Sequence, residues 1–247
     1  MNKNFHTNNI SLYEHLANKE PSTDVITNCL LLISTPRSGS TYFSSVLNAS
    51  KQLGITNEWF NPQQIMAFCD FFGIKQDQFD LQEYVKFIVS RSSSQGWFSC
   101  KMHINHWLYW SERGVDLMDM QWNHVFYLKR KNKIKQAVSL ARARKTNAWR
   151  AYDSPMAEDT STFTDILESL SWLYEHEKIY ENHLQSYCSR SFVYEDFAFE
   201  NSQDIFKEFS RIVGTTCKPN PLNNTKRQES INPKNCKVNH FIDWLSQ

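Results

Sequence analysis

The sequence predicts an α/β fold in which a P-loop-like, mostly parallel sheet is flanked by helices, and three observations support it. Short apolar runs alternate along the chain with segments of helical periodicity, which is the pattern of repeated βα units. The first run, residues 29–33, is apolar at every position, as expected of a strand buried on both faces. Only 6 glycines and 7 prolines occur in 247 residues, which argues against a disordered or loop-dominated chain.

The elements follow from these patterns in chain order. Strands are expected at residues 29–33, 53–56, 97–102, 124–128 and 192–194. Helices are expected directly after the first strand, around 81–89, 134–141 and 205–213, over 163–184, and as a short amphipathic segment at 238–246. Residues 220–235 are polar and form a predicted loop. The length suits one large domain over residues 1–247, with its core at about residues 27–228.

The net charge, the hydropathy pattern and the cysteine spacing limit the kinds of partner and location that are expected for this protein. The formal net charge is +1, so no overall field attracts nucleic acid, and no nucleic-acid partner is expected. Residues 1–20 lack the apolar stretch of a signal peptide, and residues 29–33 are too few to cross a bilayer. The six cysteines are scattered without a CxxC pair, which predicts neither a zinc site nor a disulfide framework. We therefore expect a cytoplasmic protein without a transmembrane segment or a metal.

The segment after the first strand predicts an anion site. Its small residues let backbone N–H groups curl around an anion, and the helix that follows adds the partial positive charge of its N-terminus. Arg37 supplies a fixed charge, and the Ser40 and Thr41 hydroxyls can donate hydrogen bonds. An ordinary capped helix would explain the hydroxyl residues but not an arginine and a glycine in the turn. The candidate ligand residues are Pro36, Arg37, Ser38, Gly39, Ser40 and Thr41.

This loop does not have the nucleotide triphosphatase pattern GxxxxGK[ST]. Ser40 follows the glycine where that pattern requires a lysine, and the basic residue stands before the glycine. Residues 192–196 superficially resemble a strand that ends in a magnesium-binding aspartate. A P-loop kinase or NTPase with a degenerate loop is therefore an alternative, and it would require Mg²⁺ and a nucleoside triphosphate.

Residues 36–41 resemble the 5′-phosphosulfate loop of sulfotransferases that use phosphoadenosine phosphosulfate (PAPS) as donor. Many members have lysine where this chain has Arg37. A second match, residues 128–139, resembles the family's other signature, in which an arginine at a strand end and a serine nine positions later hold the 3′-phosphate. Arg130 and Ser139 stand at those positions, and Asn132 replaces the usual aspartate. Arg130 is also expected at the carboxyl end of a strand, the edge where open parallel sheets bind ligands.

Among the subgroups of these sulfotransferases, the chain resembles most the bacterial trehalose-sulfotransferase-like, carbohydrate-type family. Its further marks, in family order over roughly residues 30–228, are Glu58-Trp59-Phe60, Lys101-Met102, Gln136-Ala137-Val138-Ser139-Leu140, Tyr194-Glu195-Asp196 and Lys226-Arg227-Gln228. The resemblance implies the sulfotransferase fold, PAPS as sulfuryl donor, phosphoadenosine phosphate (PAP) as product, and no metal. It also adds Lys226, Arg227 and Gln228 to the donor-binding residues.

Glu58 is the predicted general base. It follows the predicted strand at 53–56, placed beside the first strand, and the subgroup that the chain resembles uses glutamate here. Apolar Trp59 and Phe60 are expected to raise the Glu58 pKa by desolvation. Two histidines just past Lys101, His103 and His106, are the alternative bases, and Glu58 would then be an ordinary loop carboxylate.

Lys101 is the third predicted catalytic residue, beside Glu58 and Arg37. The expectation is that it contacts the bridging oxygen or the sulfuryl group; the alternative is a solvated lysine at a strand end.

The expected reaction is transfer of a sulfuryl group from PAPS to an acceptor hydroxyl on a saccharide or glycolipid. A hydroxyl or amine of a small secondary metabolite is the alternative acceptor, so O- and N-sulfation both stay open. A non-enzymatic PAPS- or phosphate-binding module would keep Arg37, Arg130 and Ser139 but dispense with Glu58. The sequence leaves the oligomeric state open, a homo-oligomer included.

Overall fold

A four-stranded sheet forms the centre of the computed structural model, which describes residues 3–149, 153, 155–198, 202–218, 241, 242 and 244. The strands are β1 (Asn28–Ser34), β2 (Trp97–His103), β3 (His124–Lys129) and β4 (Arg190–Val193). All pairings are parallel, and the strand order is β2-β1-β3-β4. The predicted α/β class, with a parallel sheet flanked by helices, is thus confirmed.

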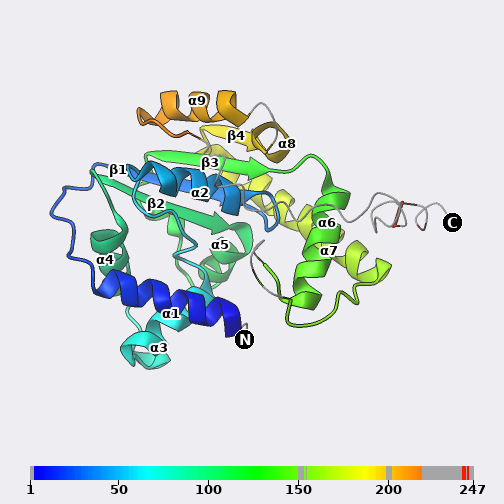
Figure 1. Cartoon of the computed structure of the whole chain (residues 1–247), viewed down its shortest axis with the longest axis horizontal. Coiled ribbons are helices and arrows are strands. Elements are labelled where there is room, and N and C mark those ends of the chain that lie inside the picture. Colours follow the sequence, from blue (N-terminus) through cyan, green and yellow to red (C-terminus); the bar gives the residue numbers. More distant parts are fainter. Residues whose placement is uncertain are drawn as a thin grey trace.

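Helices cover both faces of this sheet. One face packs against α2 (Ser40–Ser50), α8 (Tyr194–Phe197) and α9 (Ser202–Val213), through a core that includes Leu30, Leu32 and Phe126. The other packs against α1 (Lys3–Ala17), α3 (Pro62–Phe72), α4 (Leu81–Ser92) and α5 (Ile104–Ser111), through Leu31 and Ile33. Figure 1 shows α9 and α1 on opposite sides of the strands. Alternating strand side chains therefore enter two separate cores, as a doubly covered parallel sheet requires.

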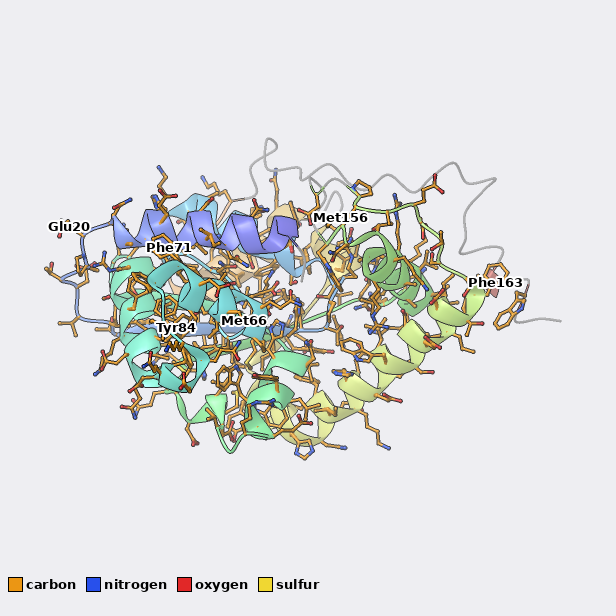
Figure 2. All side chains as sticks on the ribbon, turned by 90° about the horizontal axis from the view of Figure 1, so that it is seen from below. Glu20, Met66, Phe71, Tyr84, Met156 and Phe163 are labelled. Carbon is orange, nitrogen blue, oxygen red and sulfur yellow. The ribbon has the colours of Figure 1, made fainter. Side chains whose placement is uncertain are left out.

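Two helices pack together near the carboxyl ends of the strands (Figure 1): α6 (Lys133–Thr146) and α7 (Phe163–Ile179). A capping box at Thr162 and Asp165 begins α7, and a π turn, Tyr180–Leu184, continues it. Figure 2 shows Phe163 at the end of α7 that lies far from the α3 and α4 region of Phe71 and Tyr84. The remaining short turns are Gln76–Gln78, Leu117–Asp119 and Gln185–Tyr187. No helix in the described part of the chain has the length and apolar character needed to cross a membrane.

The prediction of a strand at residues 53–56 is wrong. This segment has no regular structure, and the residue after it, Asn57, forms an isolated bridge with Cys100 of β2 and not with β1. The sequence patterns also did not predict α1, α3, α5 or the short α8, whose first residue falls within the strand predicted at 192–194. For α3 the signals were present: Asn61 caps the helix, Pro62 follows it, and Gly73 ends it at φ 67°.

Two predicted C-terminal elements fall largely outside the described residues. The loop at 220–235 lies wholly outside them. Of the helix predicted at 238–246, Phe241, Ile242 and Trp244 are described, and all three are helical.

The strand order contains a topological switch point at one place on the carboxyl edge. The chain leaves β1 toward β2 on one side and leaves β3 toward β4 on the other, so β1 and β3 are neighbours whose connections diverge. Open α/β sheets bind ligands at such a switch point. The segments that follow these two strands carry Arg37 and Arg130.

Candidate functional site at the carboxyl edge of the sheet

Two left-handed residues shape the loop between β1 and α2. Arg37 has φ 64° and Gly39 has φ 84°, and Gly39 is the N-cap residue of α2. A Cβ at Gly39 would collide with the Tyr194 ring and lie 3.2 Å from Cε2 of Phe197. Glycine is therefore required both by the backbone and by the close approach of α8.

Gln136 of α6 holds the loop in place through two hydrogen bonds. Its Nε2 donates to Thr35 Oγ1 at 2.9 Å and to the Pro36 carbonyl at 2.8 Å, and the residue is fully buried. The loop conformation is therefore fixed by the protein's own hydrogen bonds.

Arg37 reaches away from the loop toward α6. Its Nε donates to Ser139 Oγ at 2.8 Å, and its guanidinium also donates to the Trp149 carbonyl. Burial lowers its pKa to about 10, with a further contribution from the positive charge of Arg130, so Arg37 remains a cation at neutral pH. The predicted ligand Ser139 thus pairs directly with Arg37.

Arg130 joins the loop from the end of β3. Its Nη1 donates to the Arg37 carbonyl at 3.2 Å, and its guanidinium lies 4.7 Å from the centre of the Tyr194 ring. Its Nε is buried without a hydrogen-bond partner, although Glu195 Oε1 lies 3.9 Å away. The Ser38 hydroxyl is likewise fully buried and unpartnered. Buried donors of this kind are normally satisfied, so both groups are available to donate to a bound ligand.

Glu195 and Asn132 shape the entry to α6. Glu195 accepts from the backbone N–H groups of Lys131 and Asn132 at 2.9 and 3.0 Å. Burial raises the Glu195 pKa, but these hydrogen bonds outweigh it and the net shift is downward. The Asn132 side chain caps the helix by accepting from Lys135 N at 2.9 Å, so asparagine serves the turn as well as aspartate would.

A second polar cluster surrounds Glu58. Lys101 Nζ lies 2.8 Å from Glu58 Oε1, His103 Nε2 lies 3.5 Å from the same oxygen, and Asn61 Nδ2 donates to Oε2 at 2.9 Å. Lys101 is only 6% exposed, so the alternative of a solvated lysine at a strand end is wrong. The predicted base and the predicted catalytic lysine therefore form a buried ion pair.

The prediction that Trp59 and Phe60 raise the Glu58 pKa is wrong in its net direction. Burial does raise this pKa, but the positive charge of Lys101, with contributions from His103, outweighs it and holds the pKa well below its usual range. Both aromatic side chains are buried in the core, and Trp59 Nε1 donates to the Ser99 carbonyl at 3.0 Å. Glu58 is thus an ionised carboxylate in this structure.

His103 connects the two clusters. Its Nδ1 lies 2.9 Å from Ser34 Oγ, and Ser34 is the last residue of β1 before the loop. The β1–β2 register pairs Ser34 with His103 and Leu32 with Lys101, which places all four on the face that α2 covers. The His106 ring lies 5.2 Å from that of His103, and burial lowers the His106 pKa to about 3, so His106 is neutral.

Most predicted site residues converge on this edge. The loop residues Pro36 to Thr41, with Arg130 and Ser139, form one cluster; Glu58, Lys101, His103 and His106 form the other. The Thr41 side chain is exposed. Lys226, Arg227 and Gln228 lie outside the described residues.

The sequence patterns did not predict the contacts made by Ser34, Asn61 and Trp149. Ser34 and Asn61 stand next to motifs that the sequence did single out, so inspection of motif neighbours could have found them. Trp149 acts through its backbone carbonyl, which no residue type signals.

Within the described residues, no group of three or more His, Cys, Asp or Glu side chains is arranged to hold a metal ion. No protein-family model matches the chain, and no curated protein matches it either.

Proposed function

We propose that this protein is a sulfotransferase that moves a sulfuryl group from PAPS to an acceptor hydroxyl on a saccharide or glycolipid. The observation that carries the proposal is the junction of the β1 and β3 loops. Arg130 contacts the Arg37 carbonyl there, and Ser38 Oγ and Arg130 Nε are buried donors without partners. Two cationic loops with unsatisfied donors suit a ligand with two anionic groups, and the resemblance of both loops to PAPS signatures supports this donor.

The reaction needs a base and positive charge in a defined arrangement. Glu58 takes the proton of the acceptor hydroxyl as its oxygen attacks sulfur and forms the new O–S bond. The bond from sulfur to the bridging oxygen breaks, and its electron pair stays on the 5′-phosphate of PAP. Arg37 and Lys101 stabilise the charge that develops on the sulfuryl and bridging oxygens; for Arg37 this requires its guanidinium to turn from Ser139 and the Trp149 carbonyl toward the loop. A sulfuryl group carries less negative charge than a phosphoryl group, so arginine, lysine and backbone donors are sufficient.

The contact between the two clusters supports this assignment of roles. The His103 ring lies between Glu58 and Ser34 and is close to both. Ser34 immediately precedes the loop assigned to the sulfate. A base beside the donor loop suits in-line attack, because the acceptor oxygen must lie next to both. His103 shares this position and is the alternative base.

The first prediction tests donor binding. We expect PAP to bind the purified protein in EDTA, measured by calorimetric titration. Arg130→Ala should weaken PAP binding about 10- to 150-fold, the loss of a charge-assisted contact worth roughly 1.5–3 kcal/mol. AMP, which lacks the 3′-phosphate, should lose less. The control is Arg113→Ala, which removes an exposed arginine stacked on Tyr109.

Three outcomes would contradict the proposal. Binding that appears only with Mg²⁺, and for ATP in preference to PAP, would indicate a kinase or NTPase. Equal losses for PAP and AMP would show that Arg130 does not hold the 3′-phosphate. PAP binding without transfer of labelled sulfate from PAPS to any saccharide, glycolipid or metabolite pool would indicate a binding module.

A further inference from the structure

Both oxygens of the Glu58 carboxylate are already engaged. Oε1 accepts from Lys101 at 2.8 Å with His103 beside it at 3.5 Å, and Oε2 accepts from Asn61 at 2.9 Å. The positive charge of Lys101 makes this carboxylate a poor proton acceptor, because a cation 2.8 Å from Oε1 favours the ionised form. For Glu58 to become a stronger base, that charge has to move away.

Lys101 is the donor best placed to leave. Among the described residues Glu58 is its only ion-pair partner, and an ammonium group has three N–H donors. Its side chain lies on the same sheet face as Ser34 and α2, which flank the loop at residues 35–39. A lysine on a flexible stem can follow a stronger anion, whereas Asn61 is fixed at the N-cap of α3.

We propose that Lys101 moves from Glu58 to the sulfuryl group when the donor binds, so that Glu58 accepts the acceptor's proton only while a donor is in place. This inference rests on the proposed function. Lys101 is then a shared cation with two alternative partners, which are Glu58 before the donor binds and the sulfuryl group afterwards.

The charges around Glu58 determine how strong the released base is. Lys101 and His103 on β2, His106 on α5 and the Cys100 thiol are the titratable groups that act on it. Burial already favours protonation of Glu58, and Lys101 is the largest opposing influence. Once Lys101 moves away, burial dominates and Glu58 becomes a stronger base; the negative charge of the sulfuryl group acts in the same direction. By linkage, donor binding must then be accompanied by proton uptake.

The test compares PAPS with PAP, which lacks the sulfuryl group. Calorimetric titrations at pH 6 and 7, each in two buffers of different ionisation enthalpy, give the number of protons taken up per bound nucleotide. We expect PAPS binding to take up a measurable fraction of one proton and PAP binding to take up less. Glu58→Gln should bind PAPS without that uptake.

Variants of Lys101 separate its movement from the effect of the sulfate charge. Lys101→Met should abolish most of the difference between PAPS and PAP, because Glu58 is already released. Lys101→Gln provides the same comparison where the methionine variant does not fold. The matched control is Lys86→Met, which removes an exposed lysine paired with Glu83 and should leave the uptake unchanged.

The outcomes distinguish this inference from the proposed function. Tight binding of PAPS and PAP with equal proton uptake, or an unchanged difference in both Lys101 variants, would overturn the shared lysine while leaving the donor site standing. Failure of both nucleotides to bind would remove the proposed function, and this inference with it.

Discussion

At the scale of single residues, the loop between β1 and α2 contains backbone strain that the surrounding structure must balance. Arg37 adopts the left-handed region at φ 64°, a conformation that costs a non-glycine residue about 1 kcal/mol or more. Gln136 donates to the Pro36 carbonyl and Arg130 donates to the Arg37 carbonyl, so hydrogen bonds fix the peptide groups on both sides of the Arg37 Cα. Strain that persists under such restraint is typical of a binding site, because it fixes the direction of the N–H groups before the ligand arrives.

Gly39→Ala should disrupt this loop in two ways. The new Cβ overlaps the Tyr194 ring and stands at φ 84°, so Tyr194 and the Arg130 guanidinium stacked on it must shift. We expect the free energy of unfolding to fall by about 1–3 kcal/mol and PAP affinity to fall more than tenfold. Urea denaturation and calorimetric titration measure the two effects.

Gly114→Ala provides the control for Gly39→Ala. Gly114 has φ 75°, but nothing lies within 4 Å of a Cβ built on it, so only the backbone cost applies. Equal loss of stability and of PAP affinity in both variants would rule out the Tyr194 overlap as the cause.

The sequence predicted which residues belong to the site, but not which side chains they contact within it. Arg37, Arg130, Glu58 and Lys101 were identified from their place after apolar runs and from motif resemblance. The contact of Ser139 with Arg37, and the depressed pKa of Glu58, depend on distances between segments far apart in the chain. Local sequence patterns contain no such distances.

At the scale of elements, the segment that carries Glu58 is irregular but firmly anchored. Tyr84 Oη donates to the Trp59 carbonyl at 2.6 Å, Trp110 Nε1 donates to the Phe60 carbonyl at 2.9 Å, and Trp59 Nε1 donates to Ser99. Side chains from α4 and α5 thus take the place of strand hydrogen bonds. The strand predicted just before this segment, at 53–56, is absent for a similar reason: the Leu53 carbonyl accepts from Ser99 Oγ, Ile55 N donates to the Ser92 carbonyl, and Thr56 pairs with the Asn48 side chain, so no sheet ladder forms.

Tyr84→Phe should loosen this anchoring. Tyr84 Oη also lies 3.0 Å from Tyr13 Oη, so the variant leaves a buried carbonyl and a buried hydroxyl each without this partner. We expect a loss of about 1–3 kcal/mol in the free energy of unfolding, measured by urea denaturation. Tyr174→Phe, at a side chain that is 55% exposed, is the matched control and should change little. A Tyr84 variant as stable as the control would show that water satisfies both groups.

The strands were easier to predict than the helices. The ends of all four strands fall within two residues of the predicted ones. The signal is strongest for β1, which is apolar from Cys29 to Ile33 because both of its faces are buried. The short helix α5 begins directly after β2 without a separating turn. In the sequence its aromatic residues therefore continue the apolar pattern of β2, and nothing marks the start of a helix.

At the scale of the whole molecule, buried histidines link stability to pH. The His106 pKa is about 3 in the folded protein and near 6.5 in an unfolded chain, so the unfolded state binds more protons between these values. Stability therefore falls as the pH drops below about 6.5. Glu58, whose folded pKa is depressed, contributes stability that is lost only below about pH 4.5, which leaves pH 5.0–6.5 to the histidines.

His106→Gln should flatten this dependence. The free energy of unfolding, measured by urea at pH 5.0–7.0, should decrease in the native protein with a slope that includes up to about 1.4 kcal/mol per pH unit from His106. His124 and His176, whose pKa values burial also lowers, contribute to both proteins, so the difference in slope is the quantity of interest. Parallel pH profiles would show that His106 protonates without unfolding.

The meeting of Arg130 with the Arg37 carbonyl joins positions 93 residues apart in the chain. Neither β1 nor β3 can present this junction alone, because it exists only once the two strands are paired. A ligand held on both loops acts as a reversible cross-link that closes a long stretch of polypeptide, α2 to α5 included. Its binding energy is therefore added to the cooperative unfolding of the sheet, and not to the opening of a single surface loop.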